Sequence, residues 1–125
     1  MPLLQITAEP GPFSAWKLEQ SYPYVSSAVC DALGVPGTRA SLGYDDLTIQ
    51  GRFTTALDKQ LQQVLLIVTA NRYPERDSLV EPSAFNICLA LEKIFGTHLR
   101  IGVWVLVGEL SSWYDNWEEH PASSS

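Results

Sequence analysis

The stretch Val64-Leu65-Leu66-Ile67-Val68-Thr69-Ala70 decides the fold of this chain. It is apolar or β-branched at nearly every position, which is typical of a strand buried within a sheet. A polar turn over residues 71–76 follows it directly. We therefore predict that residues 64–70 form a buried central strand.

The sequence before this strand predicts a strand followed by a helix. Residues 2–8 alternate apolar and polar side chains, as a short strand does. Ser14 suits a helix N-cap, and Gly34 with Pro36 forms a stop signal. Pro23 removes a backbone hydrogen bond, so we expect a kink or a late helix start there. The apolar residues that recur on one helical face are Leu18, Tyr22, Val25, Val29 and Leu33.

The pattern between the first helix and the central strand leaves the structure open. Leu42, Tyr44 and Leu47 are compatible with a strand, but Asp45 and Asp46 interrupt the alternation. Residues 51–60 have the pattern of a loop or a short helical turn.

The sequence after residue 76 predicts a second helix and a last strand. Ser78 and Glu81 stand at the spacing of a capping box, so Pro82 is expected in the first turn and Gly96 is expected to end the helix. A strand is expected over residues 99–107. Apolar residues alternate on one of its faces and Trp104 and Leu106 occupy the other, so we expect both faces to be covered.

These elements run β-α-β, then a loop, then β-α-β. Leu33-Gly34 and Phe95-Gly96 close the two helices in the same way, which indicates a duplicated unit. Right-handed crossovers make the strands of each unit parallel and place both helices on one face. We therefore predict an α/β (α+β) fold, a duplicated β-α-β unit with a four-stranded mixed sheet and two helices on one face. A single domain is expected over residues 1–117, with a disordered tail over residues 118–125.

The composition excludes several classes of function. The chain has 125 residues and a formal net charge of −6, so the basic surface that binds nucleic acid is not expected. No apolar run approaches the ~18 residues of a membrane helix, and no signal-peptide pattern begins the chain. A cytoplasmic protein without a membrane partner is expected. Cys30 and Cys88 are expected to be reduced core thiols, and no metal or other cofactor is predicted.

Several stretches are similar to known enzymes. Met1-Pro2-Leu3-Leu4, residues 31–36 (DALGVP), residues 64–68 (VLLIV) and residues 90–93 (ALEK) resemble the malonate semialdehyde decarboxylase branch of the tautomerase superfamily. Residues 72–76 (RYPER) and the last strand also resemble the cis-chloroacrylate dehalogenases of that superfamily. Its members are small β-α-β enzymes that work with an N-terminal proline. The resemblance implies a homotrimer that acts on a small anionic oxo-acid.

Pro2 is the catalytic residue that the resemblance implies. If Met1 is removed, the secondary amine of Pro2 becomes the chain terminus, where an amine titrates at about 7.7–8.0. Burial in an apolar pocket lowers that pKa, so the amine serves as a general base near neutral pH. A cationic acid and an iminium with an aldehyde are the other roles open to it. A retained Met1 would acylate Pro2 and abolish its basicity.

The resemblance further implies that Arg72 and Arg76 bind the substrate carboxylate, which guanidinium groups grip with two parallel hydrogen bonds. The residues alone leave another interpretation open, in which both arginines lie on the surface and pair with Glu75 and Asp77. Trp113 is expected to contact substrate in the pocket of a neighbouring subunit, or to form an interface patch without substrate contact.

The chain departs from the family pattern at its acids. The decarboxylase branch carries an aspartate where residues 37–39 stand, and the dehalogenases carry a histidine where Leu33 stands. Asp45, Asp46 and Glu109 are the candidate substitutes. We predict an isomerase or lyase for small oxo-carboxylic acids, with malonate semialdehyde decarboxylation as the leading reaction. The alternatives are keto-enol tautomerisation of an arylpyruvate and a non-catalytic trimeric binding protein.

Overall fold

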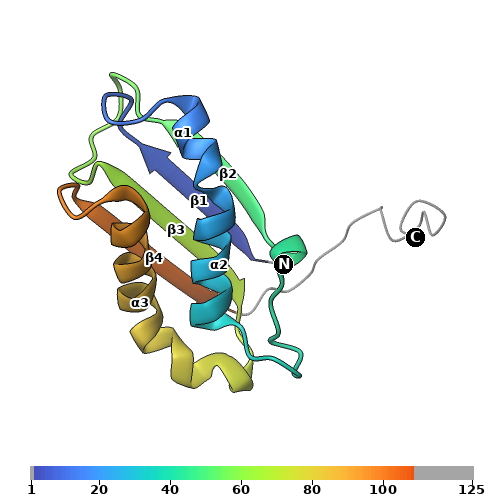
Figure 1. Cartoon of the computed structure of the whole chain (residues 1–125). Helices are drawn as coiled ribbons and strands as arrows, with labels where there is room; N and C mark the ends of the chain where they lie inside the picture. Colours follow the sequence, from blue (N-terminus) through green and yellow to red (C-terminus); the bar gives the residue numbers. More distant parts are fainter. Residues whose placement is uncertain (1, 109–125) are drawn as a thin grey trace.

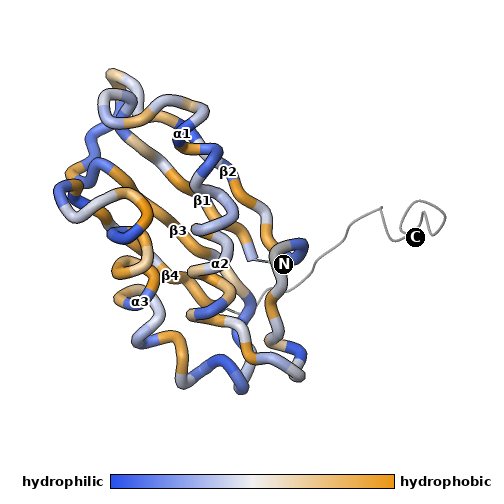
Figure 2. Tube along the Cα trace, viewed as in Figure 1, coloured by the Kyte–Doolittle hydropathy of each residue, from blue (hydrophilic) through white to orange (hydrophobic). Residues whose placement is uncertain are grey.

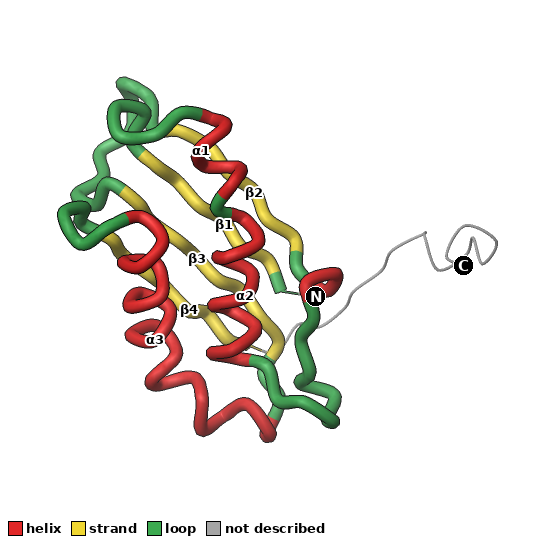
Figure 3. The backbone as a smooth tube through the Cα atoms, viewed as in Figure 1, coloured by secondary structure: helices red, strands yellow, loops and turns green. Residues whose placement is uncertain are grey.

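The computed structural model describes residues 2–108. A single layer of helices covers one face of a four-stranded sheet (Figures 1 and 3). The strands are β1 (Leu3–Ala8), β2 (Thr48–Phe53), β3 (Val64–Asn71) and β4 (Ile101–Gly108). The helices are α1 (Ala15–Gln20), α2 (Tyr22–Leu33) and α3 (Asp77–Phe95), with short 3-10 turns η1 (Tyr44–Asp46) and η2 (Pro74–Arg76).

The sheet has the order β2-β1-β3-β4 and mixes strand directions. β1 runs parallel to β2, β3 runs parallel to β4, and β1 runs antiparallel to β3. Each parallel pair is joined through a helical crossover on the same face, so the chain consists of two β-α-β units. The predicted fold class is confirmed.

The core lies between the sheet and the helices. Alternate residues of β1 and β3 point toward the helices and are fully buried, and Figure 2 shows much of β3 and β4 as hydrophobic. Leu18, Val25, Val29 and Leu33 face them from α1 and α2, as predicted, and Ile87 and Leu91 face them from α3. The buried residues that the strands contribute are Leu4, Ile6, Ala8, Val64, Leu66 and Val68.

Pro23 breaks the first helix where the sequence predicted. α1 ends at Gln20 and α2 begins at Tyr22, which places Pro23 in the first turn of α2, where a missing N–H costs little. Ser14 caps α1 by accepting a hydrogen bond from the Lys17 backbone N–H at 3.1 Å. The helix signals of this segment are therefore confirmed.

The capping box predicted at Ser78 and Glu81 is wrong. α3 begins at Asp77 because it continues directly from the η2 turn, and its first residue has no side-chain cap. Ser78 thus lies inside the helix, and Pro82 is an interior residue. Gly96 ends α3 as predicted, with φ of 104°.

The segment around residue 50 also differs from the prediction. β2 runs from Thr48 to Phe53, so residues 51–53 are strand and not loop. The strand pairs with β1 along its whole length, from Leu3 opposite Thr48 to Ala8 opposite Phe53. Backbone pairing at the sheet edge places it there, whereas its side chains are mostly polar and exposed.

β4 is covered on one face only within this chain. Its face toward α3 packs on the core through Ile101, Val103 and Val105. Trp104 is 61% exposed and Leu106 is 51% exposed on the other face, so the expectation that both faces are covered fails for the isolated chain. None of the helices between residues 2 and 108 combines the length and apolarity that crossing a bilayer requires.

Candidate active site

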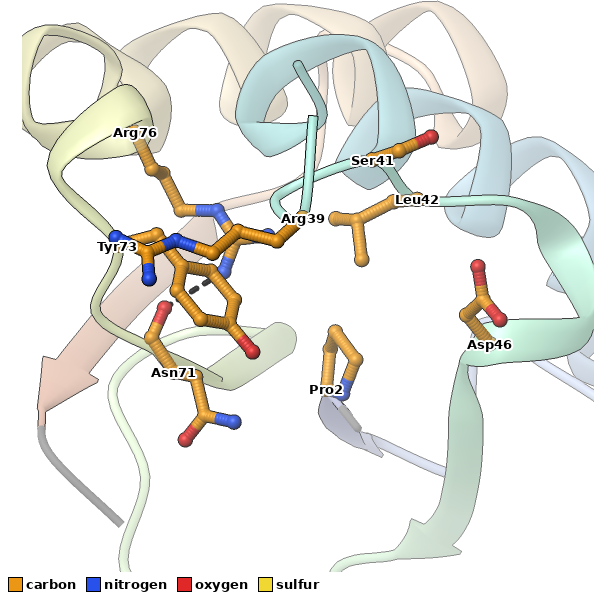
Figure 4. A pocket seen from close by; sticks show the side chains of 8 residues that line it. All are labelled: Pro2, Arg39, Ser41, Leu42, Asp46, Asn71, Tyr73 and Arg76. Atoms are coloured by element: carbon orange, nitrogen blue, oxygen red, sulfur yellow. Dashed lines mark hydrogen bonds between the residues drawn. The ribbon is translucent and has the colours of Figure 1, made fainter. Parts of the chain in front are cut away.

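Pro2 lies directly before β1 and is buried. Its carbonyl oxygen accepts a hydrogen bond from the Thr48 backbone N–H at 3.1 Å, which joins the starts of β1 and β2. The Pro2 ring borders a cavity of about 240 Å³ (Figure 4). The cavity is lined by Pro2, Arg39, Ser41, Leu42, Asp46, Asn71, Tyr73 and Arg76.

The sheet topology explains why these residues meet. β3 and β4 run in the direction opposite to β1 and β2. The first residues of β1 and β2 therefore lie at the end of the sheet where β3 and β4 finish. The connection that leaves α2 crosses this same end before β2 begins, beside the N-terminus (Figure 3). The cavity therefore collects side chains from the chain start, from that connection and from the turn after β3.

Arg76 forms the inner wall of the site. Its guanidinium is almost fully buried, with 2% exposure of the residue, and donates three hydrogen bonds to backbone carbonyl oxygens. Nε bonds Leu33 at 2.9 Å, and the two terminal nitrogens bond Asn71 at 2.7 Å and Ala40 at 3.1 Å. Burial lowers the pKa of Arg76, but a guanidinium stays protonated in proteins. The group thus fixes the loops around the cavity and brings a positive charge to it.

Tyr73 lies between two guanidinium groups. The Cζ of Arg39 is 5.3 Å from the ring centroid and that of Arg76 is 5.4 Å from it, which is within cation-π range. Arg39 also pairs with Glu75 through Nε and Oε2 at 3.3 Å. The pKa of Glu75 is lowered, mainly by a hydrogen bond to its own backbone N–H. Desolvation opposes this lowering, and the hydrogen bond and charge of Arg39 add smaller contributions to it. These contacts hold the exposed Arg39 side chain over the cavity.

Asp46 approaches Pro2 from the side opposite Arg39 and Tyr73 (Figure 4). Its Oδ2 accepts a hydrogen bond from the Gly43 backbone N–H at 2.7 Å, which orients the carboxylate. Of the three acids considered from the sequence, Asp46 lines the cavity, Asp45 does not, and Glu109 lies outside the described residues. The site therefore places the Pro2 ring between a carboxylate on one side and a guanidinium on the other.

The other predicted site residues lie elsewhere. Arg72 is 59% exposed and pairs with the half-exposed Asp77 at 3.3 Å, and it is not among the residues that line the cavity. Trp113 lies outside the described residues. A substrate-binding role for these two residues stays a prediction. Among residues 2–108, no group of His, Cys, Asp and Glu side chains is arranged to hold a metal ion.

Arg39 is the charged lining residue that the sequence analysis missed, and Ser41, Asn71 and Tyr73 are polar ones. Arg39 was noted only as part of a stretch that lacks an acid. The signal that identifies it is its place in the connection after α2, because parallel β-α-β units return that connection to the end of the sheet where Pro2 lies.

Comparison with known proteins identifies solved structures of similar fold but no matching sequence family. The chain matches no family model and no curated protein. Its structure is similar to 5-carboxymethyl-2-hydroxymuconate delta-isomerase, with a TM-score of 0.64 and 11% identity over 96% of this chain and 92% of that chain. It is also similar to Pt0534 inactivated by 2-oxo-3-pentynoate, with a TM-score of 0.59 and 15% identity over 90% of this chain and 91% of that chain.

Malonate semialdehyde decarboxylase, for which decarboxylase and hydratase activities are described, gives a TM-score of 0.51 and 16% identity over 90% of this chain and 89% of that chain. Several of the matching structures are members of one superfamily, and isomerases and a decarboxylase are among them. The chain shares with them the four-stranded mixed sheet with helices packed on one face. Its fold is therefore that of the tautomerase superfamily.

Proposed function

We propose that this protein is an isomerase or lyase that acts on small oxo-carboxylic acids, with the Pro2 amine as its acid or base. The observation that carries the proposal is the shared cavity of Pro2, Arg39 and Asp46. Proton transfer at the carbon next to a carbonyl group requires three parts. These are a secondary amine, a cation that binds the substrate carboxylate, and a second acid-base group.

The buried position of Pro2 supports its role as a base. After loss of Met1, the ring nitrogen becomes a secondary amine, and the apolar side chain of Leu42 lies beside the ring carbons of Pro2 (Figure 4). An apolar surrounding disfavours the charged form of an amine and lowers its pKa. A neutral amine at physiological pH takes a proton from the carbon next to a carbonyl group.

The arginines support a carboxylate on the substrate. Arg39 reaches the cavity from its mouth, and Arg76 keeps two of its five N–H groups outside its three backbone hydrogen bonds. The overall charge of the chain is negative, so this local pair of cations is what attracts an anion. A cavity of about 240 Å³ suits a small acid and excludes a polymer.

Malonate semialdehyde decarboxylation is the leading reaction. This reaction uses the protonated form of Pro2 instead of the neutral amine. The bond between C2 and the carboxylate breaks, and its electron pair forms an enolate whose oxygen accepts a hydrogen bond from the Pro2 ammonium. Carbon dioxide leaves as this bond breaks, and a proton from solvent water then adds to C2 and yields acetaldehyde. The structural similarity to a malonate semialdehyde decarboxylase and the sequence resemblance at residues 31–36 support this choice.

Keto-enol tautomerisation of an arylpyruvate is the second candidate, and the place of Asp46 favours it. In this reaction Pro2 removes a proton from C3 while the carbonyl oxygen gains one, so two groups must act on the substrate. Asp46 and Pro2 approach the cavity from different sides, as such a transfer requires.

Two assays test the proposal. Carbon dioxide release from malonate semialdehyde and ketonisation of an enolised arylpyruvate are measured for the wild type and for Pro2→Ala, which replaces a secondary amine with a primary one. We expect a loss of roughly 10²-fold or more in the active assay, the usual size of general acid-base catalysis. Equal rates in both proteins would leave the non-catalytic binding protein as the better interpretation.

Mass spectrometry of the untagged protein tests the chemical premise. We expect Met1 to be absent and 2-oxo-3-pentynoate to form a covalent adduct on the Pro2 nitrogen, as an electrophilic oxo-acid attacked by an amine. An intact Met1 would contradict a proline mechanism whatever the rates. An adduct on the wild type that is unaffected by Arg39→Gln would contradict carboxylate binding by Arg39.

We propose that the protein assembles as a homotrimer. The sheet face opposite the helices bears exposed apolar side chains on β4, including Trp104 and Leu106, and further apolar side chains on β3. A contiguous apolar sheet face of this kind is typical of a surface covered by another chain. Light scattering is expected to give three chains per particle, and a monomer at micromolar concentration would contradict the assembly.

A further inference from the structure

A second cavity lies at the other end of the sheet from Pro2. Its volume is about 290 Å³, which is at the lower edge of the range for small-molecule sites. Phe13, which follows β1, and Phe95 and Leu99, which precede β4, contribute to its wall. Because β1 ends where β4 begins, the length of the sheet separates this cavity from Pro2 (Figure 1).

The cavity lies beside the break between α1 and α2, because Gln20, Ser21 and Tyr24 line it. Ser21 ends the first helix, and its hydroxyl donates a hydrogen bond to the Leu18 carbonyl group. The two helical segments are therefore separate at the point where the end of α3 approaches them. Phe13 and Phe95 fill part of the gap as an edge-to-face pair with centroids 5.3 Å apart, and an apolar recess remains beside them.

The polar groups at the mouth of the cavity favour an anion. Lys17 and Gln20 of α1 line it, together with His98 of the turn after α3, and none of the described lining residues is an acid. This is notable in a chain with a net charge of −6. The turn also positions the imidazole, because Gly96 has φ of 104° and a Cβ there would stand 2.7 Å from the His98 ring.

We propose that this cavity binds a small aromatic carboxylate. The aromatic ring enters the recess against Phe13 and Phe95, where edge-to-face contacts are available, and the carboxylate meets Lys17 at the mouth. Gln20 and His98 supply further hydrogen-bond donors. The proposal does not depend on the function of the Pro2 site.

The experiment titrates 1-naphthoate, and its neutral counterpart 1-naphthalenemethanol, into the full chain and follows backbone amide shifts by NMR. We expect saturable shifts at Lys17, Gln20 and Phe95. Shifts confined to Ser41, Asn71 and Tyr73 would place the ligand in the Pro2 cavity and overturn the proposal, and so would the absence of saturation.

Variants separate the carboxylate contact from the apolar one. Lys17→Gln is expected to weaken naphthoate binding by roughly two- to fivefold, as for an exposed ion pair, and to leave the neutral ligand unchanged. Lys59→Gln removes an exposed lysine outside the cavity and is the matched control. Equal naphthoate binding by these two variants would contradict the assigned role of Lys17.

A blocking variant tests the apolar recess. Gln20 is exposed at the last position of α1, so Gln20→Trp is expected to fill the mouth without disturbing the core. The variant should then bind neither ligand, while its thermal unfolding midpoint stays that of the wild type. Unaltered binding of both ligands by a folded Gln20→Trp protein would overturn the proposal.

Discussion

Arg76 ties its own turn to the end of α2, because its Nε–H donates to the carbonyl oxygen of Leu33 at 2.9 Å. Two further hydrogen bonds, to Asn71 and Ala40, connect the same guanidinium to the end of β3 and to the loop after α2. One buried side chain therefore sets the geometry of the cavity that Pro2 borders.

Replacement of Arg76 should destabilise the whole protein. Arg76→Met keeps much of the side-chain volume but leaves three carbonyl groups without their donor, so we expect a loss of about 3 kcal/mol in the free energy of unfolding. Arg72→Met is the matched control, because its exposed pair with Asp77 is worth less than about 0.5 kcal/mol. Urea unfolding measures both. Similar midpoints for the two variants would contradict the structural role of Arg76.

Gly96 should tolerate a side chain less well than Gly37. Both have positive φ, at 104° and 77°, but a Cβ on Gly96 would meet the His98 ring at 2.7 Å whereas nothing lies within 4 Å of one on Gly37. Gly37→Ala is expected to cost about 1 kcal/mol through backbone strain alone, and Gly96→Ala about 2 kcal/mol or more.

The His98→Ala background isolates the contact from the strain. In that background we expect Gly96→Ala to cost less than in the wild type, because the ring that its Cβ meets is gone. Urea unfolding of the four proteins of this cycle gives the coupling. Additive effects would show that the His98 ring moves aside at no cost and that backbone strain alone destabilises the Gly96→Ala protein.

Pro82 should be a site where stability is gained. It lies inside α3, where it removes a helical hydrogen bond and crowds the preceding turn, yet it is exposed and its loss leaves no cavity. Pro82→Ala is expected to raise the free energy of unfolding by about 1–3 kcal/mol. Pro23→Ala is the comparison, with a change under about 1 kcal/mol because Pro23 occupies the first turn of α2. An equal shift of the thermal unfolding midpoint in Pro82→Ala and Pro23→Ala would contradict this reasoning.

The sequence predicted the elements whose side chains alone determine their structure. The strand at residues 64–70 and the break at Pro23 follow from burial and from a missing N–H, both of which are local properties. β2 was missed because it is an edge strand that backbone pairing with β1 holds in place, and such pairing leaves little trace in its mostly polar residues.

The site was predictable in part for a similar reason. Pro2 and Arg76 were named from the sequence, and the structure brings them to one cavity. Arg39 was missed because its place over Pro2 depends on the path of the connection after α2, which no local pattern determines. The capping box failed because the η2 turn feeds directly into α3 and removes the need for a cap at Ser78.

The open face of β4 should control assembly. Trp104 pairs with Ile67 across the strands and is 61% exposed, so the two present an apolar surface to a second copy of the chain. Trp104→Glu places a charge on that surface, where burial without a partner is costly. We expect the particle mass from light scattering to fall from three chains to one chain of 13.9 kDa.

Leu57→Glu provides the control for that change. Leu57 is 97% exposed in the loop before β3 and belongs to no strand of the sheet, so the same substitution there should leave the mass unchanged. The helical signal in far-ultraviolet circular dichroism should stay the same in both variants, because Trp104 contributes little to the core of its own chain. If Trp104→Glu keeps the mass of the wild type, the β4 face is not the surface through which the copies meet.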